Sequence, residues 1–121
     1  MALKLVKIEK FSETVAVRRP TDRDGVSREE TFTCVFRHVH AEEFQQMIED
    51  IKDGTLTNKE LLHRVLTDVK DVYDAEGKQV DFETCREYIC ENLDLSNATV
   101  GKFVEALHGS KGKNSNGSRR G

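Results

Sequence analysis

Long hydrophobic runs, tryptophan and an even set of cysteines are all missing from this chain of 121 residues. No apolar stretch approaches the ~20 residues of a membrane-spanning helix, so we expect no membrane segment. Residues 1–7 alternate lysine with apolar side chains and lack the continuous apolar stretch of a secretory signal, which favours a cytosolic location. The cysteines have no CxxC spacing, which argues against a disulfide framework and a zinc ribbon. We therefore expect three small buried thiols, Cys34, Cys85 and Cys90.

Charge is abundant but unevenly placed. Charged residues make up 34% of the chain and hydrophobic residues 36%, so length and composition predict one domain with a modest core. Residues 109–121 carry four basic side chains, no acid and nothing apolar, which predicts a disordered tail behind a single domain of residues 1–108. Without that tail, 15 basic residues stand against 22 acidic ones, a net charge of −7. An acidic body argues against binding to duplex DNA, and the tail lacks aromatic residues for stacking on bases.

The first third of the chain has the pattern of β-structure. Residues 3–8 and 14–18 are short β-like runs, and residues 20–25 form a turn that contains proline and glycine. Residues 28–39 have a period of two, with an apolar face made by Phe32, Cys34 and Phe36. Three such strands imply an antiparallel sheet.

From residue 41 onward the period becomes helical, and four one-sided apolar stripes predict four packed helices. The first covers residues 41–53 and stops at Gly54, and the second covers residues 58–70. The third begins at Asp81 or Glu83, and Ser96 caps the fourth. The inward faces are Phe44, Met47, Ile48 and Ile51; Leu62, Val65, Leu66 and Val69; Cys85, Tyr88, Ile89 and Leu93; and Val100, Phe103, Val104 and Leu107. The predicted fold class is α+β, with an N-terminal antiparallel sheet of about three strands and a four-helix C-terminal part.

The sequence contains no pattern that is typical of a catalytic site. Cys34 or Cys85 with His63 or His108 is the combination open to nucleophilic catalysis, but no motif links these residues. Cys34, His38 and His40 share one strand face and could bind a soft metal, although Cys34 lies in an apolar row. Residues 22–25 fit a hairpin tip better than a calcium loop, because the further oxygen ligands are missing. We therefore expect a protein that is not an enzyme and that has no metal or cofactor.

The order of segments resembles the tail assembly chaperones of long-tailed bacteriophages and prophages. A β-region ends in Glu-Thr-Phe-Thr-Cys-Val-Phe-Arg (residues 30–37), and an acidic amphipathic helix follows at residues 41–53. A central stretch, residues 66–82, is similar to the family's helix, Asp-x-x-Gly turn and return to an aromatic residue. A closing helix ends in Phe-Val-Glu-Ala-Leu (residues 103–107). The resemblance covers residues 28–108.

Membership of this family would imply a non-enzymatic function in the cytoplasm of a bacterial host. Such proteins bind the tape measure protein before the tail tube, built from the major tail protein, polymerises around it. The candidate partner-binding residues are Leu3, Leu5 and Ile8 in the first β-like run, and Tyr73, Val80 and Phe82 around the acidic turn. The first run is also a surface for strand addition or weak self-association into rings, which Lys4 and Lys7 would moderate. The alternative is a small prophage regulatory or nucleic-acid-associated protein that uses its basic tail.

Overall fold

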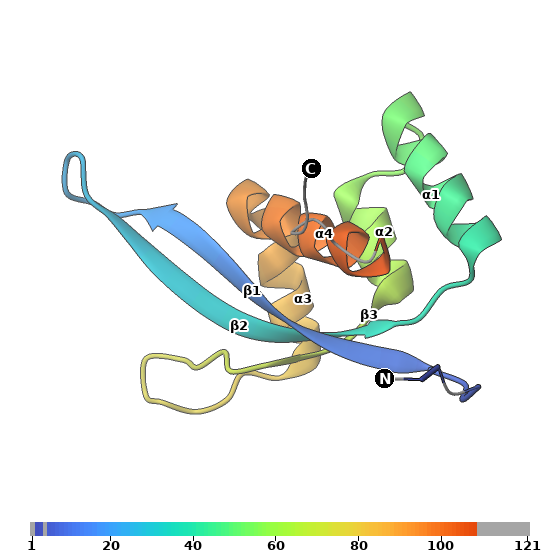
Figure 1. Ribbon diagram of the computed structural model, residues 1–121. Coiled ribbons are helices and arrows are strands. Elements are labelled where there is room, and N and C mark those ends of the chain that lie inside the picture. Colours follow the sequence, from blue (N-terminus) through green and yellow to red (C-terminus); the bar gives the residue numbers. More distant parts are fainter. Residues whose placement is uncertain (1, 4, 109–121) are drawn as a thin grey trace.

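A three-stranded antiparallel sheet and four helices make up the computed structural model, which describes residues 2, 3 and 5–108 (Figure 1). In chain order the elements are β1 (Lys10–Pro20), β2 (Ser27–Arg37), α1 (Ala41–Asp53), α2 (Asn58–Val65), β3 (Leu66–Lys70), α3 (Phe82–Glu91) and α4 (Leu93–Leu107). The strand order is β1–β2–β3, so β2 is central and the other two strands form the edges. This arrangement confirms the predicted α+β class, with its antiparallel sheet and four helices. The predicted tail, residues 109–121, lies outside the described residues.

The first two strands form a long hairpin whose tip extends beyond the helices (Figure 1). β1 and β2 pair over their whole length of 11 residues each. At the predicted turn, the N–H of Thr21 donates to the carbonyl of Val26 over 3.2 Å, and Gly25 has φ of +70°. Burial alternates along both strands, because successive side chains point to opposite faces of a sheet. The predicted inward row of β2 is buried: Phe32, Cys34 and Phe36.

The prediction of two separate strands before the turn is wrong. β1 is a single strand, and residues 11–13, predicted to separate two runs, lie inside it. The aromatic ring of Phe11 packs 5.5 Å from Phe36 and 6.2 Å from Phe103, which gives this segment a place in the core. Residues 5–8 are not part of any strand and are exposed. The sheet ladder ends where the N–H of His38 donates to the carbonyl of Glu9 over 2.9 Å.

The third strand lies where the sequence predicts the end of a helix. α2 stops at Val65, and the following residues pair antiparallel with β2. Leu66 and Val69 are three residues apart, a helical spacing, yet both face the core from a strand. A bulge explains this, because Leu66 pairs with Phe36 while the next paired residue of β2, Val35, lies opposite Asp68. One extra residue in a strand converts the spacing of two into a spacing of three, so the apolar pattern fits both structures.

The helix boundaries follow capping chemistry, with one exception. α1 has the predicted bounds and ends at Gly54 with φ of +80°. Thr57 and Glu60 form a reciprocal capping box on α2, and the Asp81 carboxylate caps α3 by accepting from the N–H of Thr84. The prediction that Ser96 caps α4 is wrong: this residue is buried inside the helix, because the chain enters α4 directly after α3 at Asn92.

α4 brings the sheet and the helices together. It packs against β1 and also contacts α2 and α3. Phe103 on this helix is fully buried, with its ring 5.2 Å from that of Phe36 and 6.3 Å from that of Phe44. Two residues predicted to face the core from α3 do not: Tyr88 and Leu93 are 49% and 73% exposed. Both lie near the junction of α3 and α4, where Tyr88 borders an open cleft.

Candidate functional site

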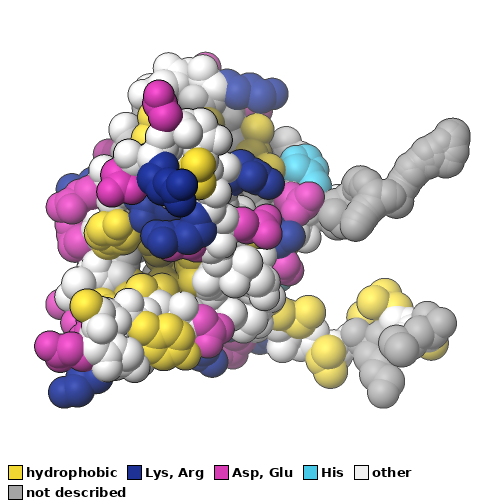
Figure 2. Space-filling view, turned by 90° about the vertical axis from the view of Figure 1, so that its left-hand side faces the viewer, with side chains coloured by type: hydrophobic (Ala, Val, Ile, Leu, Met, Phe, Trp, Pro, Cys, Tyr) yellow, Lys and Arg dark blue, Asp and Glu magenta, His cyan; other side chains and the backbone are white. Residues whose placement is uncertain are grey.

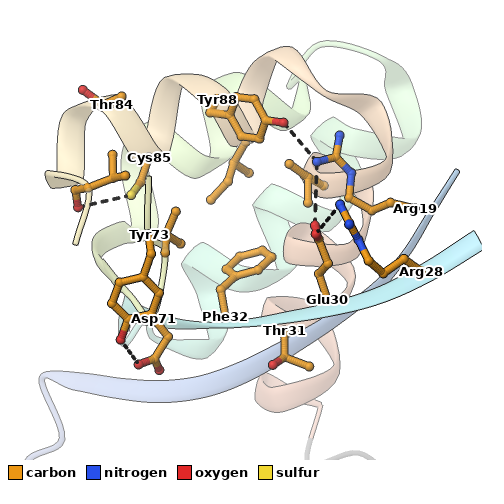
Figure 3. A pocket seen from close by; sticks show the side chains of 14 residues that line it. Arg19, Arg28, Glu30, Thr31, Phe32, Asp71, Tyr73, Thr84, Cys85 and Tyr88 are labelled. Carbon is orange, nitrogen blue, oxygen red and sulfur yellow. Dashed lines mark hydrogen bonds and ion pairs between the residues drawn. The ribbon is translucent and has the colours of Figure 1, made fainter. Parts of the chain in front are cut away.

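A cleft of about 660 Å³ lies between the outer half of β2, helix α3 and the segment that follows β3 (Figure 3). We call residues 71–81 the acidic loop, because they contain four carboxylates and one lysine. Three groups of side chains surround the cleft: a hairpin group (Arg19, Arg28, Glu30, Thr31 and Phe32), a loop group (Asp71, Val72, Tyr73 and Val80) and a helix group (Thr84, Cys85, Tyr88, Ile89 and Leu95). These residues come from segments far apart in the sequence, so the cleft exists only in the folded chain.

The base of the cleft is apolar. Phe32, Cys85, Ile89 and Leu95 are each buried, and the thiol of Cys85 donates to the carbonyl of Val80 over 3.5 Å. On the side of the molecule shown in Figure 2, hydrophobic side chains are visible inside a hollow next to a cluster of basic side chains. An apolar base with a polar rim is typical of a site that accepts apolar groups of a ligand or partner.

The acidic loop is held in a defined shape by its own hydrogen bonds. Asp71, where the chain leaves the sheet, has φ of +66°, which is uncommon for any residue other than glycine. Its N–H donates to the side chain of Gln79 over 2.9 Å, and its carboxylate accepts from the hydroxyl of Thr33 over 2.8 Å. Further along, the N–H of Val80 donates to the carbonyl of Val72 over 2.9 Å. The loop is therefore a small hairpin that turns away from β2 and forms one wall of the cleft.

Arg19 connects the outer part of the hairpin to the helices on the opposite wall. Its guanidinium donates to the carboxylate of Asp94 over 2.9 Å, to the hydroxyl of Tyr88 over 3.0 Å and to the side chain of Asn92 over 3.3 Å (Figure 3 shows the contact with Tyr88). The hydrogen bonds to Tyr88 and Asp94 raise the pKa of the guanidinium, and Arg19 in turn lowers the pKa of Asp94. We call this group the Arg19 latch. It fixes the distance between the hairpin and α3.

A second apolar surface lies at the opposite end of the hairpin, in residues 2, 3 and 5–9, which we call the arm. Leu3, Leu5, Val6 and Ile8 are between 55% and 96% exposed. In Figure 2 the arm projects from the body with hydrophobic side chains around it. These four residues are half of the eight large hydrophobic side chains that are exposed in the described chain, and Tyr73 and Tyr88 at the cleft are two more.

The structure brings some of the candidate partner-binding residues together and separates others. Tyr73 and Val80 both line the cleft. Phe82 does not line the cleft, and the guanidinium of Arg86 lies 5.1 Å from the centre of its ring. Leu3, Leu5 and Ile8 belong to the arm. The sequence reading missed Arg19, although continuing the period of two past Val15 and Val17 predicts that it faces inward.

The cysteine and histidine candidates are dispersed. Burial raises the pKa of Cys34 to about 12, with a smaller contribution from the nearby Cys85, whose own pKa burial also raises. His63 lies 3.8 Å from the carboxylate of Glu87, and the ring of His108 packs against Phe44. The rings of His38 and His40 are 6.3 Å apart, and residues 2, 3 and 5–108 contain no group of three potential metal ligands.

Comparisons of this chain with protein-family models, with curated proteins and with solved structures gave no match. Among the residues that the structure describes, no helix is long and apolar enough to cross a membrane.

Proposed function

We propose that this chain is a non-enzymatic tail assembly chaperone of a long-tailed phage or prophage. It binds the tape measure protein, and the major tail protein of the tube, in the host cytoplasm during tail assembly. The family resemblance of residues 28–108 supplies the identity of these partners. The structure supports the proposal through the kind of surface that it presents.

The observation that carries the proposal is the open cleft with its apolar base. A concave apolar surface with a polar rim is the usual form of a binding site. Here the base is formed by core residues such as Phe32 and Ile89, and charged side chains such as Arg28 and Glu30 line the rim. A holder of aggregation-prone segments requires both properties.

The arm supports the same function as a second contact. Its four exposed apolar side chains alternate with lysines in the sequence, and it continues directly from β1, an edge strand. An edge strand offers unpaired backbone groups to another chain. Weak self-association through the arm is therefore part of the proposal, with Lys7 and Lys4 opposing tight assembly.

Co-expression with the tape measure protein of the same phage or prophage tests the function. We expect a larger soluble fraction of the tape measure protein and co-purification of the two chains. A matched pair of chaperone variants sharpens the test: Leu5→Asp in the arm and Val26→Asp at the hairpin tip, where a charge falls on a surface outside both proposed contacts. The first is expected to reduce co-purification and the second to leave it unchanged.

A tape measure protein that stays equally insoluble with and without this chain, and never co-purifies with it, would contradict the proposal. The regulatory alternative then becomes the better one. It predicts a band shift with nucleic acid that weakens steeply between two salt concentrations and disappears when residues 109–121 are removed.

A further inference from the structure

The cleft lies along an unpaired edge of the central strand. β2 pairs with β1 over all its residues, but with β3 only from Thr33 to Phe36. β3 ends at Lys70, opposite Thr33, and the positive φ of Asp71 turns the chain away from the sheet. Residues 27–32 of β2 thus have a strand neighbour on one side only. No other backbone hydrogen bond within the described part of the chain reaches these six residues.

The side chains around the cleft show that it surrounds this edge. Glu30 and Phe32 point to the helix side of the sheet and Thr31 to the opposite side, yet all three border the same opening (Figure 3). In the interior of a sheet, consecutive side chains cannot line one cleft, because they stand on opposite faces. The cleft therefore gives access to the backbone of β2 as well as to the apolar base.

The edge has hydrogen-bonding groups to offer. Successive residues of a strand direct their N–H and C=O groups alternately to its two sides, so about half of residues 27–32 present both groups to the cleft. Such groups are satisfied by water in the free protein, or by a strand from another chain.

We propose that an extended segment of the partner protein adds to residues 27–32 as a further strand, in line with β3. This inference rests on the proposed function and names the conformation and chemistry of the bound segment. The segment is about six residues long, or about 20 Å, at the rise of a strand. Its alternate side chains are apolar and enter the base formed by Phe32, Cys85, Ile89 and Leu95.

A helix is a poorer occupant of this site. Its backbone groups are already paired within the helix, so it leaves the edge of β2 without a partner. An added strand lies ~4.8 Å from its neighbour, whereas a helix with side chains is about 10 Å across. The strand thus satisfies the edge and covers the apolar base in one arrangement.

The charged residues at the two ends of the open edge indicate which side chains the bound segment carries beside its apolar residues. The acidic loop has four carboxylates against one lysine, and Asp71 stands at the inner end of the open edge. At the outer end, the guanidinium of Arg28 is paired with Glu30 at 3.0 Å, which leaves little free positive charge. A lysine or arginine is therefore favoured at the end of the segment that lies beside the acidic loop.

A designed peptide tests strand addition directly on the unmodified protein. The probe is acetyl-Lys-Val-Thr-Val-Thr-Val-Lys-amide, labelled for fluorescence anisotropy, with two versions that carry N-methyl groups on alternate residues. We expect one methylated version to bind at least about tenfold more weakly and the other to bind like the parent, because only one set of N–H groups faces β2. Equal binding of both versions, or no binding of the parent, would overturn the proposal.

The matched variants Val80→Asp, on the cleft wall, and Val26→Asp, at the exposed hairpin tip, link the edge to the proposed function. Val80→Asp is expected to weaken peptide binding and capture of the tape measure protein by about tenfold or more, and Val26→Asp to change neither. Retained capture by Val80→Asp would refute the strand site while the chaperone function stands. Alternating N-methyl effects without any capture would support the strand site and refute that function. Self-association of the unmodified chain that Val80→Asp abolishes would identify the arm of a second copy as the occupant, against the proposal.

Discussion

Replacing Arg19 by alanine is expected to release the outer part of the hairpin from the helices. The guanidinium makes three hydrogen bonds to side chains that are 69 to 75 residues away in the sequence. Arg18, the preceding residue, has the same side chain on the opposite face of β1 and donates to Ser27 over 3.1 Å at an exposed position. The two arginines therefore form a matched pair, of which one joins distant elements and the other does not.

The size of the effect follows from the exposure of the ion pair. The side chains of Arg19 and Asp94 are 21% and 30% exposed, between the surface and the interior. Exposed pairs contribute about 0.2–1 kcal/mol, and hydrogen bonds to charged groups about 1.5–3 kcal/mol when water is largely excluded. We expect Arg19→Ala to lower the free energy of unfolding by about 1–2 kcal/mol and Arg18→Ala by less than about 0.5 kcal/mol.

Urea denaturation followed by circular dichroism measures both changes. A double-mutant cycle of Arg19→Ala with Asp94→Asn then isolates the pair, with an expected coupling of about 0.5–1.5 kcal/mol. Hydrogen exchange supplies a local readout, because amides in the outer half of the hairpin are expected to exchange faster without the latch. Additive single effects, with a coupling below about 0.3 kcal/mol, would show that the ion pair of Arg19 with Asp94 contributes nothing to stability, and an unchanged midpoint for Arg19→Ala would refute the latch as a whole.

Three further changes test other parts of the fold. Phe103→Ala should lower the free energy of unfolding by about 3–5 kcal/mol, because the side chain is fully buried among three other rings. Ile48→Ala should lower it clearly less, because Ile48 is only half-buried. Equal losses would mean that α1 is packed more tightly than described. Thr57→Ala removes the capping box of α2 and should cost about 1 kcal/mol in the same denaturation assay, and an unchanged midpoint would contradict the cap. Folding lowers the pKa of Asp94, so the ionised carboxylate contributes to stability. This contribution is fully present when the pH is above the ordinary pKa of about 3.9, and it is lost as the pH falls through the pKa of the folded state. Asp94→Asn should therefore make the stability less dependent on pH below about 4, and an unaltered acid profile would argue against the shift.

Much of the fold could be predicted from the sequence because local signals and burial agree there. The bounds of α1 follow from one apolar stripe, an acidic first turn and a terminal glycine, and the structure confirms them. The hairpin turn follows from Pro20 and Gly25 in the same way. In both places each residue adopts, in the folded chain, the conformation that its local preference already favours.

Prediction from the sequence failed where pairing between distant segments decides the structure. Leu66 and Val69 continue the apolar stripe of α2, so nothing local distinguishes one more helical turn from a bulged strand beside β2. The β-like run of residues 3–8 shows the reverse error, because residues 3 and 5–8 pair with no strand in the described part of the chain. The cleft was only partly predictable, because Tyr73 and Val80 stand near a visible turn, whereas their proximity to Arg19 and Ile89 depends on the packing of the hairpin against α3.

The short length of β3, the strand that the sequence did not predict, also bears on the proposed function. A strand that continued past Lys70 would cover residues 27–32 and close the cleft with its own side chains. Instead the carboxylate of Asp71 accepts from Thr33, which holds the chain in the conformation that ends the strand. The Arg19 latch then keeps the uncovered part of β2 beside α3, so the backbone edge and the apolar base stay within reach of the same segment. In the proposed complex the partner supplies the residues that β3 lacks, and both the sheet and the core are completed only when it is bound.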